Sequence, residues 1–262
     1  MNLPASRQRS ILSRGQAIGV VLFLLLMTAI WQAACVAFDV PGYILPSPLE
    51  IGRSMVDDYQ ILAKHTLVTV TEIGIGLATG VLTGVLLAFL MSRSETVSNA
   101  LYVPILATQT TPTIAIAPIL IVWFGVGLAP KVIVITIFSF FPVLVNTLAG
   151  LQATGRQMLL LMESVSASEW QIYRYVRIPM ALPHFFAGLR LAAAASVIGA
   201  VVVEWVSSVE GLGYLLILHE SRLNVDKAFA TLIILMALGV AVFAVMALIE
   251  RRFSWTKHLG VD

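Results

Sequence analysis

Amide and hydroxyl side chains lie beside prolines in two apolar segments of the chain. Gln109 and Thr110 precede Pro112, and Asn146 follows Pro142. A proline removes a backbone hydrogen bond, which a membrane helix tolerates where a neighbouring group or water satisfies the freed carbonyl. The three polar side chains could therefore hydrogen-bond a small solute in an interior cavity, or they could hydrogen-bond neighbouring helices. The sequence leaves both interpretations open.

Two acids, Glu72 and Glu204, lie in segments that are otherwise apolar. A carboxylate inside a membrane is unfavourable and is by default functional. Glu204 lies near the outer end of its segment, where it either lines an outer gate or pairs with a base such as Arg222. Glu72 is expected at the rim of the membrane, either solvated or paired.

Catalytic and metal-binding patterns are not evident. The four histidines are scattered without the spacing of metal ligands, and we find neither a Ser/His/Asp set nor paired carboxylates. The chain also lacks GxxxxGK[ST], the loop that cradles ATP phosphates. We therefore expect no catalytic residue, metal or cofactor on this chain, and we expect any ATP to be used by a separate subunit.

The composition is that of a membrane protein, since 59% of the 262 residues are hydrophobic and only 11% are charged. About 20 mainly apolar residues are needed for a helix to cross a bilayer. This predicts an all-α membrane protein with six transmembrane helices, at about 17–38, 66–91, 101–125, 131–151, 186–206 and 228–249. We expect a single transmembrane domain over 16–250, with tails at 1–15 and 251–262.

The basic residues are distributed unevenly between the two sides of these six helices. Eleven of the sixteen Lys and Arg residues lie on the side of the termini. Because basic loops face the cytoplasm, both termini and the loop at 156–185 are predicted to be cytoplasmic. The net charge of +2 gives no indication of a nucleic-acid partner.

Two further patterns concern packing. Gly76, Gly80 and Gly84 form overlapping GxxxG units, which let helices approach closely, either within one subunit or between two. Apolar residues spaced between charges from Pro48 onward predict an amphipathic helix at the outer surface.

The predicted cytoplasmic loop holds a polar stretch, SVSASEWQIYRYVRIPMALPHFFAGLR, between two apolar blocks. Residues 164–175 are compatible with a helix, and we expect Pro179 and Pro183 to end it. Such a helix could project from the bilayer and offer side chains to a soluble partner. The residues we expect to form this coupling element are Ser164, Ser166, Ala167, Ser168, Glu169, Trp170, Gln171 and Arg174.

This loop resembles the EAA loop of importer-type ABC transporter permeases, whose pattern is E-A-A-x3-G-x9-I-x-L-P. Aligning Pro179 with the final proline places Ser166 on the glycine and Leu160 on the acid, so the second half of the pattern matches and the first half departs from it. Further similarity to the nitrate, sulfonate and taurine branch extends over most of the chain, in YILPSPLEI, PTIAIAPILIVWFGVGLAPKV, FFPVLVNTLAGL and VVVEW with EGLGYLL. That branch also includes transporters of riboflavin and of thiamine-pyrimidine precursors.

The resemblance implies a permease of the bacterial inner membrane that works with a second permease copy. It also implies two cytoplasmic ATPase subunits and an extracytoplasmic solute-binding protein. We expect Glu169, Trp170 and Gln171 to contact the ATPase. A path of Gln, Thr, Asn and aromatic side chains, without Lys or Arg, suggests a heterocyclic vitamin or its precursor as the solute, with a sulfonate, taurine or nitrate as the alternative. A different class, a secondary transporter or channel driven by an ion gradient, has only Glu72 and Glu204 as intramembrane acids.

Overall fold

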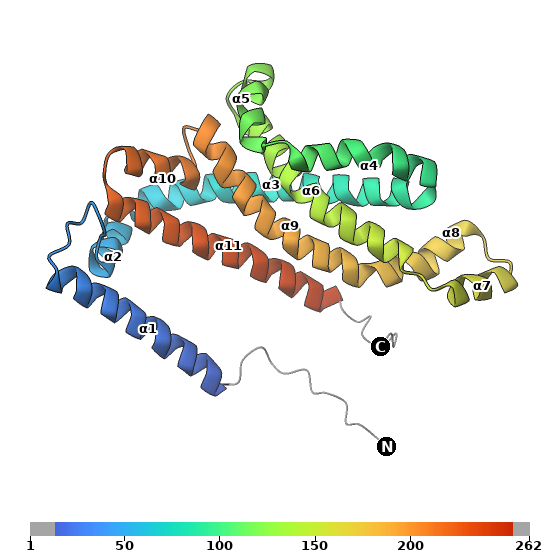
Figure 1. The fold of residues 1–262 in the computed structure, drawn as a ribbon, viewed down its shortest axis with the longest axis horizontal. Helices are drawn as coiled ribbons and strands as arrows, with labels where there is room; N and C mark the ends of the chain where they lie inside the picture. The colour runs from blue at the N-terminus through green and yellow to red at the C-terminus, as the bar shows by residue number, and fades with distance from the viewer. Residues whose placement is uncertain (1–13, 254–262) are drawn as a thin grey trace.

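The computed structural model describes residues 14–253, and every regular element in that range is helical (Figure 1). The expected tails at 1–15 and 251–262 lie largely outside the described residues. The elements are α1 (Arg14–Ala37), α2 (Pro48–Asp57), α3 (Tyr59–Arg93), α4 (Glu95–Thr110), α5 (Thr113–Phe124), α6 (Leu128–Gln152), α7 (Arg156–Ser164), α8 (Glu169–Ile172), the π-helical η1 (Tyr173–Arg177), α9 (Ile178–Ser207), α10 (Leu212–Ser221) and α11 (Val225–Phe253).

Three long helices, α3, α6 and α9, form the centre of the molecule, and α3 meets α6 through its glycines. A methyl group added at Gly76 would lie 2.5 Å from the side chain of Ile135, and one at Gly80 would lie 2.6 Å from Ser139. At Gly84 it would lie 2.6 Å from the carbonyl oxygen of Phe140. These glycines therefore serve packing within one chain, because any side chain would separate the two helices.

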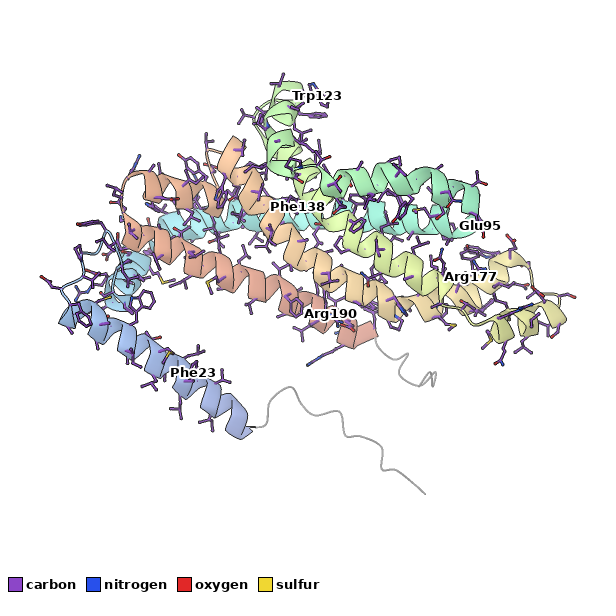
Figure 2. The ribbon with its side chains drawn as sticks, viewed as in Figure 1. Phe23, Glu95, Trp123, Phe138, Arg177 and Arg190 are labelled. Carbon is purple, nitrogen blue, oxygen red and sulfur yellow. The ribbon has the colours of Figure 1, made fainter. Side chains whose placement is uncertain are left out.

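Five helices are long and apolar enough to cross a membrane, and a sixth crossing exists if the bent pair α4 and α5 counts as one. The observed helices extend past the expected 17–38, 66–91, 131–151, 186–206 and 228–249 by several residues at one or both ends. The chain is thus a multi-pass membrane protein, with exposed apolar side chains such as Phe23 on α1 available to lipid (Figure 2).

The expected single helix at 101–125 is wrong, because the chain is broken there. The axes of α4 and α5 differ by 98°. Thr111 adopts an extended conformation, with φ −77° and ψ 127°, as expected of a residue that precedes a proline. Pro112 then leaves no backbone N–H to continue the helix. Pro104 and Pro118, by contrast, lie inside α4 and α5.

The short helices gather at opposite ends of the long ones. At one end lie α2 and α10, and at the other lie α7 and α8 (Figure 1). The expected amphipathic helix from Pro48 is present as α2, which Ser47 and Glu50 cap reciprocally at its start. We did not predict α10, a ten-residue apolar helix that is too short to be recognised as a span.

Candidate functional site

The predicted coupling loop forms two short helices joined by a tight turn. α7 ends at Ser164, and α8 begins after Ser168, whose backbone N–H donates to the Gln171 side chain at 2.7 Å. The Ser168 hydroxyl accepts in return from the backbone N–H of Gln171 at 3.4 Å. This capping box fixes the start of a helix that is only four residues long.

The turn between α7 and α8 carries a backbone conformation that favours glycine. Ser166 has φ +54°, in the left-handed region. An L-residue is strained there by roughly 1–2 kcal/mol. The residue in this chain that aligns with the glycine of the EAA pattern is thus the one held in a glycine-like conformation. The loop keeps the backbone geometry although the glycine itself is absent.

The expected end of the loop helix at Pro179 and Pro183 is wrong. The residues after α8 continue as η1 and then as α9, so that the chain is helical from Glu169 to Ser207. Pro179 and Pro183 both lie within this continuous helix, and Pro179 comes two residues after the π-helical turn η1. The coupling segment is therefore a rigid extension of a membrane helix.

Side chains of the coupling segment divide into an anchored set and an exposed set. Tyr173 and Val176 are buried, and the Tyr173 hydroxyl donates to the carbonyl of Ser92 at the end of α3, at 3.0 Å. Trp170 is 56% exposed and Tyr175 is 66% exposed. A large aromatic side chain left in water next to a fixed backbone is typical of a surface that another protein covers.

The predicted solute-path residues do not gather in one place. Gln109 and Thr110 are exposed at the end of α4, beside the break before α5. Asn146 is half-buried in α6, and its side-chain amide donates to the carbonyl of Pro142 at 2.8 Å. That bond is a contact within α6, which continues through Pro142.

Glu204 lies elsewhere, in a buried polar cluster close to the α2–α10 end. Its carboxylate accepts from the Thr69 hydroxyl at 2.6 Å and from the backbone N–H of Gly213 at 2.5 Å, and not from Arg222. The Thr69 hydroxyl also accepts from the N–H of Leu212 at 2.8 Å. Glu204 thus holds the start of α10 against α3 and α9.

The same cluster contains an ion pair between Glu72 and Lys131. The ammonium of Lys131 lies 2.5 Å from Glu72, and both residues are buried. Glu72 is therefore paired, which was one of the two alternatives expected for it. Its position differs from the expectation, because it lies in the interior and not at the rim of the membrane. Lys131 lies inside α6 and is the partner of Glu72 that the sequence analysis did not identify. An acid within an apolar span requires such a partner, and that requirement was the available signal.

A pocket of about 480 Å³ opens beside this cluster, between α3, the start of α6 and the loop before α10. Its polar lining comes from Thr71, Glu72, Lys131, Ser208 and Glu210. Outside the membrane segments, Lys64 donates to Glu210 at 2.6 Å and holds the pKa of that carboxyl below its usual value. The two ion pairs Glu72–Lys131 and Glu210–Lys64 therefore compensate each other's charges around this pocket.

Arg190 links the N-terminal half of α9 to α11. Its guanidinium forms an ion pair with Glu250 of α11. The ion pair therefore links two membrane helices, α9 and α11.

Comparison with known proteins identifies the class of the chain. Residues 80–255 match the family described as the binding-protein-dependent transport system inner membrane component. The chain belongs to this family. A probable ABC transporter permease protein of Haemophilus influenzae is 38% identical over 90% of this chain and 96% of its own length.

Two further permeases are similar over almost their whole length. The formylaminopyrimidine transport permease protein ThiX of Halalkalibacterium halodurans is 38% identical, over 92% of this chain and 97% of its own. The riboflavin transport system permease protein RibX of Chloroflexus aurantiacus is 32% identical, over 90% and 88%. The crystal structure of an amino acid ABC transporter shares the fold, with a TM-score of 0.57 and 21% identity over 76% of this chain and 97% of that chain.

The coupling segment and the polar cluster lie at opposite ends of α9. Both lie within or beside the three central helices, since α9 carries the coupling segment at one end and Glu204 near the other (Figure 1).

Proposed function

We propose that this permease forms the membrane path of an ATP-driven importer for a heterocyclic vitamin or vitamin precursor. The similarity of 38% to a formylaminopyrimidine permease and 32% to a riboflavin permease, each over nearly the whole chain, carries the proposal. A taurine permease of Escherichia coli and an aliphatic sulfonate permease of Bacillus subtilis are less similar, at 27% and 26%. Sulfonate, taurine or nitrate is the second candidate class of solute.

The chemistry of the membrane segments supports a neutral or weakly charged solute. Lys131 is the basic residue buried deepest in the described spans, and Glu72 neutralises it. An anion would have to compete with that carboxylate for the lysine. Gln109 and Thr110, which lie together at the end of α4, offer amide and hydroxyl groups suited to a heterocycle with hydrogen-bond donors and acceptors.

The path is expected between two copies of the chain. Gln109 and Thr110 lie at the break between α4 and α5, and apolar residues at the far end of α5, Val122 and Trp123, are 83% and 71% exposed. Two such faces in contact would leave a passage at the break, because a bent backbone cannot pack closely along its whole length. The ATPase subunits would bind the α7–α8 end, and a solute-binding protein would deliver the solute at the α2–α10 end, with both termini in the cytoplasm of a bacterial cell.

Uptake by the reconstituted transporter tests the proposal. The permease would be placed in proteoliposomes with its ATPase and its binding protein, and uptake of radiolabelled formylaminopyrimidine, riboflavin and taurine compared. We expect ATP-dependent uptake of one of the two heterocycles and none of taurine. ATP-dependent uptake of taurine alone would contradict the assignment of the solute and leave the importer mechanism intact.

A gradient-driven transporter is the alternative of a different class. It would require acids able to exchange protons or cations, whereas Glu72 and Glu204 are held by Lys131, Thr69 and Gly213. Uptake by proteoliposomes that contain this chain alone, driven by a proton or sodium gradient, would establish the alternative and exclude the importer.

A further inference from the structure

A second pocket, of about 520 Å³, lies at the α7–α8 end, where the coupling segment meets the membrane helices. It is bounded by the turn between α3 and α4, the end of α6 and the start of α7. Two arginines, Arg93 and Arg177, line it, together with hydroxyl and amide side chains that include Ser98, Asn99 and Thr154. It is chemically different from the first pocket because it has an excess of positive charge.

The two arginines are held near one another by Tyr173. The guanidinium carbon of Arg177 lies 4.8 Å from the centre of the Tyr173 ring, and that of Arg93 lies 5.8 Å from it. Arg177 also donates to the Tyr173 hydroxyl at 3.1 Å. An aromatic ring shared in this way orients both guanidinium groups, which otherwise repel each other.

Neither arginine is neutralised within the described chain. The ion pairs formed by residues 18–253 do not include Arg93 or Arg177, and the acid of the lining, Glu95, is exposed and pairs with neither. Donors are also unsatisfied, because the Nε of Arg177 and the hydroxyl of Thr154 are buried without a hydrogen-bond partner. Figure 2 shows Glu95 and Arg177 at the same end of the molecule.

The depth of the pocket indicates the kind of anion. Arg93 is the last residue of the membrane-spanning helix α3, so the pocket lies where hydrocarbon gives way to headgroups. Planar guanidinium groups bind phosphate oxygens with two parallel hydrogen bonds, and basic pockets between membrane helices bind anionic headgroups. We propose that Arg93 and Arg177 form a binding site for a phosphate group, at the junction between the membrane helices and the coupling segment.

Occupancy of this site would affect the coupling segment directly. Arg177 is the last residue of η1, and Tyr173, which it contacts, hydrogen-bonds the end of α3. A phosphate bound between Arg93 and Arg177 would join α3 to η1 and stiffen the base of α8. The site is separate from the solute path, so its test does not depend on transport.

The phosphate could come from a phospholipid or from solution, and the test distinguishes the two sources. The full-length chain would be placed in nanodiscs of phosphatidylcholine, with or without phosphatidylglycerol, and the retained lipid measured by native mass spectrometry. In a parallel arm, its melting temperature in detergent would be measured against inorganic phosphate. The variants are Arg93→Gln, Arg177→Gln and the double variant, with Arg252→Gln as the control at an exposed basic residue of α11 outside this pocket.

We expect wild-type and Arg252→Gln proteins to retain phosphatidylglycerol. The double variant should retain at least roughly tenfold less of this lipid than wild type. Arg93→Gln alone should reduce retention, and since Arg93 is exposed its loss leaves the fold intact. Stabilisation by inorganic phosphate that depends on both arginines, without retention of the lipid, would support the site and assign it to a soluble phosphate. Equal retention and equal melting in all variants would overturn the proposal. So would loss of co-purification with the ATPase together with unchanged lipid retention, because the pocket would then belong to that interface.

Discussion

The two ends of the permease use their polar residues in opposite ways. Close to the α2–α10 end, buried acids are bound by groups of the same protein, as Glu72 is by Lys131 and Glu204 by Thr69. At the α7–α8 end, Trp170 and Tyr175 extend into solvent and Arg93 and Arg177 have no acidic partner in the described chain.

The surroundings explain the difference. A charge inside a membrane helix must find its partner in the same bundle, since lipid offers none. A residue beyond the membrane is solvated without a partner and remains available to another molecule. Buried polar residues of this permease are therefore expected to determine stability, and exposed residues of the coupling segment are expected to determine assembly. Four variants test this division.

Lys131→Met should have the largest effect. It leaves Glu72 as an uncompensated buried carboxylate, and breaking a buried ion pair in this way costs about 3–5 kcal/mol. Thermal unfolding in detergent would detect the loss. The double variant Glu72→Gln with Lys131→Met should recover much of it, and Lys64→Met, which removes the exposed pair with Glu210, should unfold like wild type. Equal unfolding temperatures for all three variants would refute a structural role for the buried pair.

Trp170→Asp should leave folding unchanged and weaken binding of the ATPase. A buried interface tryptophan commonly contributes about 2 kcal/mol or more, so co-purification of the ATPase and ATP-coupled uptake should both be lost. Tyr59→Asp is the control, because Tyr59 is an equally exposed aromatic residue at the opposite end, at 61% against 56%. Normal co-purification of Trp170→Asp would show that the exposed tryptophan is not part of the interface.

Ser166→Gly should stabilise the turn of the coupling segment. Glycine adopts φ +54° without strain but gains freedom in the unfolded chain, which leaves a net benefit of about 0.5–1 kcal/mol. Hydrogen exchange of the α8 amides should slow. Ser164→Gly, at the last helical position of α7, is the control and should not slow it. Faster exchange in Ser166→Gly would show that the serine side chain stabilises this turn.

His219→Gln should have the smallest effect, which appears only in acid. Burial, together with the charge of Lys227, lowers the pKa of His219 in the folded protein. As the pH falls through the ordinary pKa of histidine, about 6.5, the unfolded chain takes up a proton before the folded protein does. This uptake favours the unfolded state and lowers the free energy of unfolding. The variant lacks this loss, so its unfolding temperature should fall less between about pH 7.5 and about pH 5.5 than that of wild type. An identical dependence on pH in both proteins would contradict the buried environment of His219.

The spans and the coupling segment could be located from the sequence, because each follows from a local pattern. Apolar runs of sufficient length predicted the helices that became α1, α3, α6, α9 and α11. The polar stretch between two apolar blocks located the loop at 156–185, and the resemblance to the EAA loop aligned Ser166 with a glycine. Only the structure showed that Ser166 adopts a left-handed conformation there. The break at Thr111 was underestimated, since prolines at 104, 112 and 118 look equivalent in sequence and only Pro112 ends a helix.

The sequence by itself determined that this chain is a helical membrane protein with a projecting polar segment, because hydrophobic length and backbone hydrogen bonding allow little else in lipid. Tertiary structure alone decided which polar residues pair with one another inside the protein. Glu72 and Lys131 are 59 residues apart, and Thr69 and Glu204 are 135 apart, so their pairing depends on how α3, α6 and α9 pack. The pairing of Arg93 with Arg177 around Tyr173 has the same origin, since no local spacing brings together residues from two helices that meet only after the bundle has formed.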